Sequence, residues 1–154
     1  MEIKRISLAE SDLVIDLFDQ YRVFYKKETD IKQAERFIKE RLAKNESVIF
    51  VALEVEKGYT IPVGFTQLYP KYSSVSAVKN WILNDLYVAH NYRKRGIGDM
   101  LIRTAMSFAK SDGATFVQLE TAVDNYSAQS LYEGIGFKKE QPETGYLVYR
   151  VQVI

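Results

Sequence analysis

A short basic segment with two glycines is the part of the chain best suited to chemistry on an anion. Arg93, Lys94 and Arg95 are consecutive, and Gly96 and Gly98 open a run with helical spacing. The first N–H groups of a helix have no partner within it, the helix dipole is positive there, and glycine lets a ligand approach the backbone. The segment lacks the third glycine of a dinucleotide-binding loop and the Gly-Lys-Ser/Thr of a P-loop. We therefore expect an anion-binding turn of another type.

The composition excludes several kinds of catalytic centre. The 154 residues include no cysteine and a single histidine, His90, which we interpret as part of a turn. Structural zinc, iron–sulfur clusters, disulfides and a cysteine nucleophile are therefore excluded, and we expect no metal site. The 21 basic and 20 acidic residues leave a net charge of +1, which gives no general attraction to nucleic acid or to a membrane. No apolar run approaches the about 18 residues of a membrane span, so we expect a cytoplasmic protein.

The residue patterns predict one α/β (α+β) domain, residues 1–154, with a mixed, mostly antiparallel sheet of about seven strands flanked by helices. A strand–helix–strand unit over Trp81–Thr121 predicts one parallel pair, and the hairpins around it predict antiparallel neighbours. Helices are expected to begin near Ser11, at Thr29 or Asp30, after Gly98 and at Tyr126. The expected strands are Glu2–Leu8, Val48–Val55, Ile61–Tyr69, Lys79–Val88, Ala114–Thr121, Phe137–Glu140 and Tyr146–Val151, with a turn at 141–145 between the last two.

Two motifs together resemble one known superfamily. Arg93-x-x-Gly96-x-Gly98 follows a strand that ends in Leu-Tyr-Val, and Asn125-x-x-Ala128-x-x-x-Tyr132 with Gly-Phe after it comes one strand later. This pairing is similar to that of the Gcn5-related N-acetyltransferase (GNAT) superfamily, and the order of elements matches over nearly the whole chain. The segment from Tyr21 to Tyr25 also resembles a subgroup near histone and polyamine acetyltransferases. The resemblance implies a GNAT-type acyl-CoA N-acyltransferase fold.

The resemblance implies acetyl-CoA as cofactor. Its pyrophosphate is expected on the basic turn and the helix start, and its pantetheine arm beside the central strand, pairing with the backbone like an added strand. Tyr132 is expected near the sulfur, where it would protonate the departing thiolate, although it also fits a half-buried packing role. Asn125 also suits the N-cap of its helix. The expected cofactor residues are Leu86, Tyr87, Val88, Arg93, Lys94, Arg95, Gly96, Ile97, Gly98, Asp99, Asn125, Ala128 and Tyr132.

The base that deprotonates the amine has more than one candidate. Asp85 lies on the central strand and Glu120 on the next one, and a water held by Asn84, Asp85 or Glu120 is an alternative. Related polyamine enzymes often carry a glutamate at the position of Asn84. Successive strand residues face opposite sides, so we expect only one of Asn84 and Asp85 to face the acceptor cleft. A backbone N–H near Val88 is the candidate to hold the thioester oxygen.

The acceptor wall predicted by the resemblance is rich in tyrosine. Aromatic rings can hold a cationic amine, so a polyamine or another small cationic amine is the expected acceptor. Phe24 is expected to belong to the helix core. Tyr21 is expected either to belong to that core or to face the cleft. The alternatives are acetylation of a lysine or N-terminal amine of a protein or peptide, and a CoA-binding sensor without catalysis. We also expect a homodimer formed through the C-terminal strands. The expected acceptor residues are Tyr21, Tyr25, Glu28, Tyr69, Tyr72 and Tyr146.

Overall fold

The computed structural model describes residues 1–140 and 145–153, which form two compact units, residues 1–120 and 121–154. Among the described residues, the first unit holds the sheet and three α-helices, and the second holds one α-helix. The elements of the first unit are β1 (Glu2–Arg5), η1 (a 3₁₀ helix, Leu8–Glu10), α1 (Asp12–Phe24), α2 (Ile31–Ala43), β2 (Val48–Glu56), β3 (Tyr59–Ser73), β4 (Val78–Val88), η2 (a 3₁₀ helix, His90–Tyr92), α3 (Ile97–Ser111) and β5 (Val117–Gln118). The second unit contains α4 (Tyr126–Ile135).

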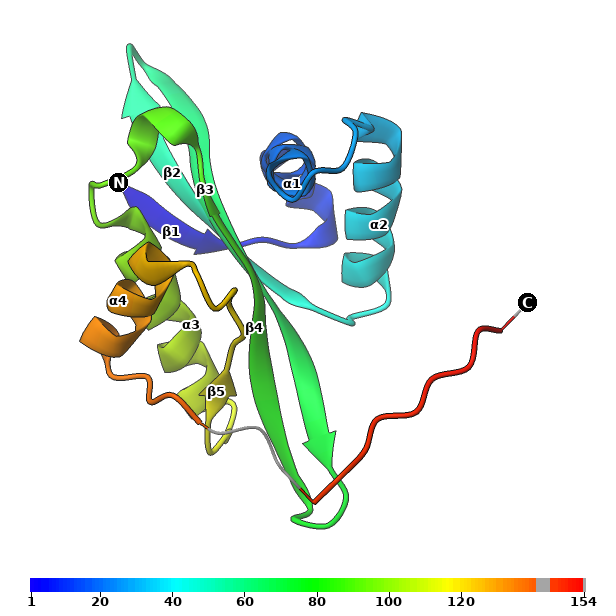
Figure 1. The fold of residues 1–154 in the computed structure, drawn as a ribbon. Coiled ribbons are helices and arrows are strands. Elements are labelled where there is room, and N and C mark those ends of the chain that lie inside the picture. Colours follow the sequence, from blue (N-terminus) through cyan, green and yellow to red (C-terminus); the bar gives the residue numbers. More distant parts are fainter. Residues whose placement is uncertain (141–144, 154) are drawn as a thin grey trace. The chain divides into compact units, whose positions relative to one another are not determined.

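The sheet of the first unit has the order β1-β2-β3-β4-β5 (Figure 1). All neighbours are antiparallel except β4 and β5, which are parallel, so the predicted mixed and mostly antiparallel sheet is confirmed. The β2–β3 hairpin turns through Lys57 and Gly58, both with positive φ. This twisted sheet provides the surface on which the helices of the unit pack.

The sheet has five strands among the described residues, and the expectation of about seven is not confirmed. Two expected strands, Phe137–Glu140 and the described part of Tyr146–Val151, are not strands in the structure. Neither has a strand partner among the described residues, and a β-strand forms only by hydrogen bonding to a neighbouring strand. The expected turn at 141–144 lies outside the described residues. The strand expected over Ala114–Thr121 is reduced to β5.

The short β5 has a local cause. The Asn80 side-chain oxygen accepts hydrogen bonds from the backbone N–H of Thr115 at 2.8 Å and of Phe116 at 3.1 Å. The N–H groups of these two residues are therefore bonded to a side chain and not to a neighbouring strand, so β5 begins only after them. The ladder pairs Trp81 with Val117 and Ile82 with Gln118, and then ends.

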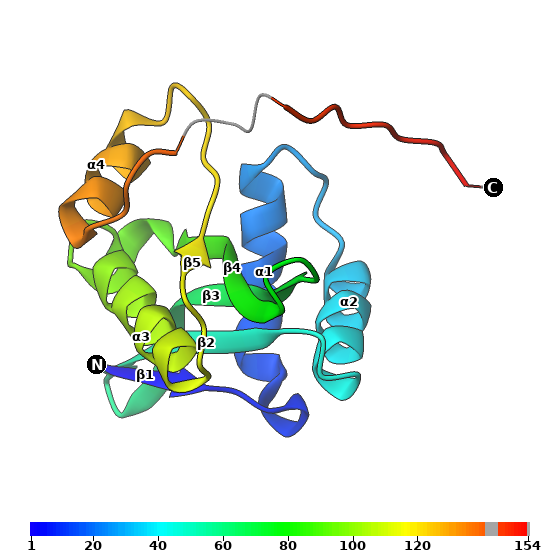
Figure 2. The ribbon, with the colours of Figure 1, turned by 90° about the horizontal axis from the view of Figure 1, so that it is seen from below.

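Helices cover both faces of the sheet in the first unit. Figures 1 and 2 show α1 and α2 on one face and α3 on the other. The apolar side of α1 and α2 packs on β2 and β3 in a core that includes Val14, Ile38 and Phe65, each fully buried or nearly so. On the other face α3 buries Leu101 and Ile102. Among the described residues, no helix has the length and apolar character needed to cross a membrane.

Local chemistry sets two of the helix ends, and the predicted start of a helix at Thr29 or Asp30 is confirmed. Asp30 caps α2, because its carboxylate accepts a hydrogen bond from the Gln33 N–H at 3.0 Å. Gly113, just after α3, has a φ of +85°, as expected for a glycine that ends a helix. These caps fix where α2 begins and where α3 ends.

Candidate active site

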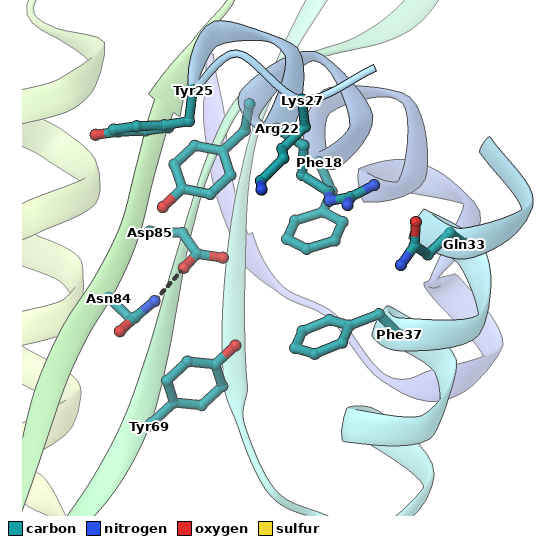
Figure 3. A pocket seen from close by; sticks show the side chains of 10 residues that line it. Phe18, Arg22, Tyr25, Lys27, Gln33, Phe37, Tyr69, Asn84 and Asp85 are labelled. Atoms are coloured by element: carbon teal, nitrogen blue, oxygen red, sulfur yellow. Dashed lines mark hydrogen bonds between the residues drawn. The ribbon is translucent and has the colours of Figure 1, made fainter. Parts of the chain in front are cut away.

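A β-bulge in β4 forms the centre of the site. Asp85 lies opposite Gln67 and Leu83 lies opposite Leu68, so Asn84 is an extra residue on its strand. A bulge interrupts the alternation of side chains between the two faces of a sheet. As a result Asn84 and Asp85 both line the same cavity (Figure 3). The expectation that only one of them faces the cleft is therefore wrong.

The cavity lies between α1 with its connection to α2, α2 itself, and the β3–β4 pair, and it has a volume of about 410 Å³. This volume is in the usual range for small-molecule sites. Figure 3 shows aromatic rings on several sides and polar groups on two opposite sides. The lining residues are Phe18, Tyr21, Arg22, Tyr25, Lys27, Gln33, Phe37, Tyr69, Asn84 and Asp85.

Asp85 is the carboxylate of this cavity and is only 2% exposed. Its Oδ2 accepts a hydrogen bond from Gln67 Nε2 at 2.6 Å, and its Oδ1 accepts one from Asn84 Nδ2 at 2.7 Å. Burial raises the pKa of Asp85, and the two hydrogen bonds offset part of that rise. A carboxylate with a raised pKa is a stronger proton acceptor than an exposed one, which suits a general base.

Aromatic side chains form much of the remaining wall. Phe18 and Phe37 stack with ring centroids 5.5 Å apart, and Tyr21 meets Tyr25 edge to face at 5.0 Å. Burial raises the pKa of the Tyr69 phenol, and the Asp85 charge raises it further. Tyr69 therefore keeps its proton and can donate a hydrogen bond to a ligand.

Two basic residues, Arg22 and Lys27, also line the cavity. Arg22 belongs to the last turn of α1, and Lys27 lies in the connection to α2. This connection is anchored by buried Asp19, whose carboxylate accepts hydrogen bonds from Thr29 Oγ1 at 2.5 Å and from the Asp30 N–H at 2.8 Å. The loop that carries Lys27 is therefore held against α1.

The expected acceptor residues are only partly brought together. Tyr21, Tyr25 and Tyr69 line the cavity. Glu28 and Tyr72 are exposed and lie outside it. Tyr146 belongs to the second unit, where it is exposed.

Two further positions differ from the sequence reasoning. Glu120, the other candidate base, is exposed and does not line the cavity. Phe24 was expected in the helix core but is 56% exposed. It lies near the end of α1, where its ring meets the Tyr87 ring with centroids 6.4 Å apart.

Arg22 lies within the Tyr21–Tyr25 segment that the sequence analysis singles out, but four other residues of the wall were missed. Lys27 could have been predicted as a wall residue, because it lies in the connection between the first two helices. The other three are helix residues whose pattern indicates only a buried or an exposed face. The missed residues are Phe18, Lys27, Gln33 and Phe37.

The basic turn begins beside the end of β4. Arg93 Nε donates a 2.8 Å hydrogen bond to the Val88 carbonyl oxygen, and its guanidinium lies over the rings of Phe24 and Tyr87 at 5.7 and 5.4 Å. The Arg95 guanidinium lies 5.1 Å from the Tyr92 ring centroid. Arg93 thus connects the basic turn to the end of α1, whose last turn also carries Arg22.

The start of α3 has the geometry of an anion site. Its N-cap residue, Gly96, has a φ of +79° and supplies no side-chain cap. The first backbone bond of the helix runs from the Met100 N–H to the Gly96 carbonyl, so the N–H groups of Ile97, Gly98 and Asp99 precede the helical ladder. Arg93, Lys94 and Arg95 beside it are exposed. Together these groups suit a phosphate better than a neutral ligand.

One edge of β4 is open beyond β5. The parallel ladder ends at Ile82, so Leu86, Tyr87 and Val88 have no strand partner on that edge among residues 1–140 and 145–153. On the other edge they pair with β3, where Val88 lies opposite Gly64. An extended ligand with amide groups could add to this open edge.

The second unit contains the other predicted motif. Asn125 caps α4, since its Oδ1 accepts a 3.2 Å hydrogen bond from the Ala128 N–H. The predicted capping role of Asn125 is therefore confirmed. Tyr132 lies on α4 and is half-buried, with its ring centroid 6.1 Å from that of Phe137.

The chain is similar to acetyltransferases in sequence and in fold. Residues 12–137 match the model of the "Acetyltransferase (GNAT) family". The chain is 40% identical over 153 residues to "Uncharacterized N-acetyltransferase YhfO" of Bacillus subtilis (strain 168), which covers 99% of this chain and 98% of that protein. A solved structure, "Crystal structure of a probable acetyltransferase", superposes with a TM-score of 0.86 at 37% identity over 99% of this chain and 98% of the other. Aminoglycoside N-Acetyltransferase AAC(6')-Iy in complex with CoA has a TM-score of 0.77 at 17% identity, covering 99% and 95%, and shares the fold.

Proposed function

Because the chain belongs to the GNAT acetyltransferase family and is an N-acetyltransferase, we propose that it transfers acetyl from acetyl-CoA to a primary amine bound in the Asp85 cavity. The observation that carries this proposal is the buried Asp85 carboxylate at the β4 bulge, with its raised pKa. The amine of the acceptor is protonated in water at neutral pH and must lose a proton before it can attack. Asp85 is placed to take that proton.

The start of α3 fits the pyrophosphate of acetyl-CoA. The uncapped N–H groups and the neighbouring basic side chains match an anion, and Gly96 adopts a left-handed conformation that other residues rarely do. The open edge of β4 at Leu86–Val88 fits the amides of the pantetheine arm. We propose Arg93–Asp99 and Leu86–Val88 as the cofactor-binding residues of the first unit. For Asn125, Ala128 and Tyr132 of the second unit, the proposal is supported by the sequence pattern.

The proposed reaction needs no covalent enzyme intermediate. When bound, acetyl-CoA supplies an activated acyl carbon and a thiolate leaving group. Asp85 would accept the proton that the ammonium group loses, directly or through a water held with Asn84. Attack by the neutral amine would form the C–N bond and break the C–S bond, and the second proton that leaves the nitrogen would balance the one taken up by the thiolate. The N–H of Val88 would donate to the acyl oxygen, and Tyr132 would give its proton to the sulfur.

Substitution of the two candidate bases tests the proposal. Asp85→Asn should lower kcat at neutral pH by about 10²–10⁴-fold while acetyl-CoA still binds, as measured by CoA release and by calorimetric titration. Glu120→Gln is the matched control and should retain activity, because Glu120 is exposed and outside the cavity. Full activity of Asp85→Asn would refute Asp85 as the base. Binding of acetyl-CoA without release of CoA in the presence of any tested amine would instead support the sensor function.

A small cationic amine such as a polyamine is one candidate for the primary-amine acceptor. The rings of Tyr21, Tyr25 and Tyr69 favour it, because aromatic faces attract ammonium groups. A lysine or N-terminal amine of a peptide would present the same reacting group. The basic residues Arg22 and Lys27 oppose an acceptor with a second positive charge.

Three broader features are also proposed. We propose that both units act as one acetyltransferase domain, which is supported by a family match that runs through both, from residue 12 to 137. A homodimer is supported by the exposed apolar side chains near the C-terminus, among them Leu147 and Val148. A monomeric mass in light scattering would refute it. A cytoplasmic location remains the prediction from sequence.

A further inference from the structure

The cavity of the proposed acceptor site is asymmetric in charge. Of the residues that line it, Asp85 is the carboxylate, and Arg22 and Lys27 are the cations. Figure 3 shows Asn84 and Asp85 on the strand side, while Arg22 and Lys27 enter from the end of α1 and its connection to α2. The proposed base therefore occupies one side of the cavity and a basic pair another.

Within residues 1–140 and 145–153, the Arg22 guanidinium has a buried nitrogen without a partner. This atom, Nη1, is buried and donates no hydrogen bond to any acceptor in the described part of the chain. The ion pairs among residues 1–140 and 145–153 do not include Arg22. A partly desolvated cation without an acceptor is costly, and an anionic ligand would remove that cost.

The buried carboxylates of this region are already engaged. Asp19, one turn before Arg22 on α1, accepts hydrogen bonds from Thr29 Oγ1 and the Asp30 N–H. Asp85 accepts from Gln67 and Asn84. Each carboxylate thus has donors of its own, and the guanidinium of Arg22 remains available to a ligand.

The backbone brings Lys27 next to Arg22. The Lys27 N–H donates to the Arg22 carbonyl at 3.0 Å, and Lys26 between them adopts a φ of +66°. This tight turn places two cationic side chains at the same cavity. Two like charges at one site repel each other, and an anion bound by both relieves the repulsion.

We infer that the acceptor is a small amine that also carries a carboxylate, with its amine toward Asp85 and its carboxylate on Arg22 and Lys27. The inference rests on the proposed function of the cavity and specifies its substrate class. The planar guanidinium of Arg22 matches a carboxylate with two parallel hydrogen bonds, and Lys27 adds a point charge. A cavity of about 410 Å³ holds a molecule of amino-acid size.

A matched series of acceptors tests the inference. The ω-amino acids from glycine to aminohexanoate are compared with n-alkylamines and diamines of equal length, with acetyl-CoA as donor. At the best length, kcat/KM for the amino acid should exceed that for the neutral amine by about 10- to 100-fold, since a hydrogen bond to a charged group is worth that factor. The diamine should be the poorest of the three. A diamine or neutral amine that matches or exceeds the amino acid at every length would overturn the inference.

A variant pair identifies the residue responsible. Arg22→Gln should raise KM for the amino acid by about 10- to 100-fold, with little change for the neutral amine. Arg22→Lys should recover part of the loss. Arg36→Gln is the matched control, because Arg36 is exposed on α2 and lies outside the cavity. Equal KM values for Arg22→Gln and the wild type would overturn the role of Arg22.

A binding measurement separates this inference from the proposed function. Calorimetric titration of the CoA-saturated protein with each member of the series reports the charge preference without turnover. Tighter binding of the amino acids than of their neutral matches supports the carboxylate preference of the cavity, whether or not acetyl transfer occurs. If such binding comes without acetyl transfer, the amino acid is a ligand of the cavity and not an acceptor, and the proposed function is refuted. Acetyl transfer with no carboxylate preference in rate or binding overturns the inference and leaves the proposed function intact. If no amino acid binds more tightly than its neutral match, the inference is likewise overturned.

Discussion

Gln67 donates a 2.6 Å hydrogen bond from Nε2 to Oδ2 of Asp85, across the β3–β4 pair at the point where β4 bulges. Gln67 is fully buried and Asp85 is 2% exposed. The bond fixes one carboxylate oxygen, and Asn84 holds the other. Burial raises the pKa of Asp85 and these donors moderate the rise, so the strength of the proposed base is set by an opposition between the two effects.

Removal of the Gln67 donor should weaken proton release from Asp85. In Gln67→Leu the pKa of Asp85 rises further, because the hydrogen bond from Gln67 favours the carboxylate. The acid limb of the kcat/KM profile should therefore move to higher pH. Activity on that limb should fall about tenfold or more, given about 1.5–3 kcal/mol for a hydrogen bond to a charged group.

Thr66→Val is the matched control for Gln67→Leu. Thr66 is equally buried on β3, and its Oγ1 donates to the backbone carbonyl of Asp85 at 2.8 Å rather than to the carboxylate. This variant should lose some stability in urea unfolding and keep the pH profile of the wild type. Coincident profiles for Gln67→Leu and the wild type would contradict the role of Gln67.

Ionisation of Asp85 should lower the free energy of unfolding as pH rises. Its folded-state pKa lies above the ordinary value of 3.8, so the folded protein holds this proton more tightly than the unfolded chain. Stability from this carboxyl therefore falls as pH rises from about 4 through the folded-state pKa, and the full cost is present above it. Asp85→Asn cannot ionise, so its stability relative to the wild type should increase through that window.

Asp112→Asn should show the opposite trend. Hydrogen bonding from Trp81, together with Lys79, holds the pKa of Asp112 below its ordinary value. Asp112 therefore stabilises the fold above the unfolded-state pKa, and this contribution is lost as pH falls through the lower folded-state value. Denaturant unfolding across the pH range measures both variants. Parallel curves for Asp85→Asn and the wild type would contradict the prediction for Asp85.

Local features of the site could be predicted from the sequence. The caps at Asp30 and Asn125 depend on side chains that bond to the backbone within one turn, so residue type and position suffice. A glycine-containing turn before α3 could also be predicted from residue type, and Gly96 is left-handed there. The basic turn is evident from consecutive residues, since three basic side chains directly precede Gly96.

Features that depend on distant segments could not be predicted. The bulge at Asn84 is a property of the pairing between β3 and β4, and a strict alternation rule assigns Asn84 and Asp85 to opposite faces. Gln33 and Phe37 reach the cavity because α2 packs beside α1. The extent of β5 depends on the Asn80 side chain from another strand. Each is decided by a contact between segments far apart in sequence.

Gly96→Ala tests the anion site at the start of α3. A Cβ at Gly96 meets no atom within 4 Å, so the cost comes from the φ of +79° and not from a clash. We expect a loss of about 1 kcal/mol in stability and a clear rise in the Kd for acetyl-CoA, because relief of the strain reorients the N–H groups. Gly58→Ala, with a φ of +81° and equally open surroundings in the β2–β3 turn, is the control. It should lose similar stability and bind acetyl-CoA normally. Similar Kd values for both variants would argue against a pyrophosphate at α3.

Tyr132→Phe tests the proposed proton donor of the second unit. The phenyl ring keeps the packing next to Phe137, so α4 should remain folded. Loss of the hydroxyl should lower kcat by about 10- to 100-fold and leave the Kd for acetyl-CoA unchanged, since protonation of the thiolate matters only during the reaction. A thioester with a more acidic thiol should narrow the gap, because its thiolate departs without a proton. Tyr126→Phe on the same helix, where Tyr126 is 72% exposed, should behave as the wild type. Unchanged kcat in Tyr132→Phe would show that Tyr132 serves packing alone.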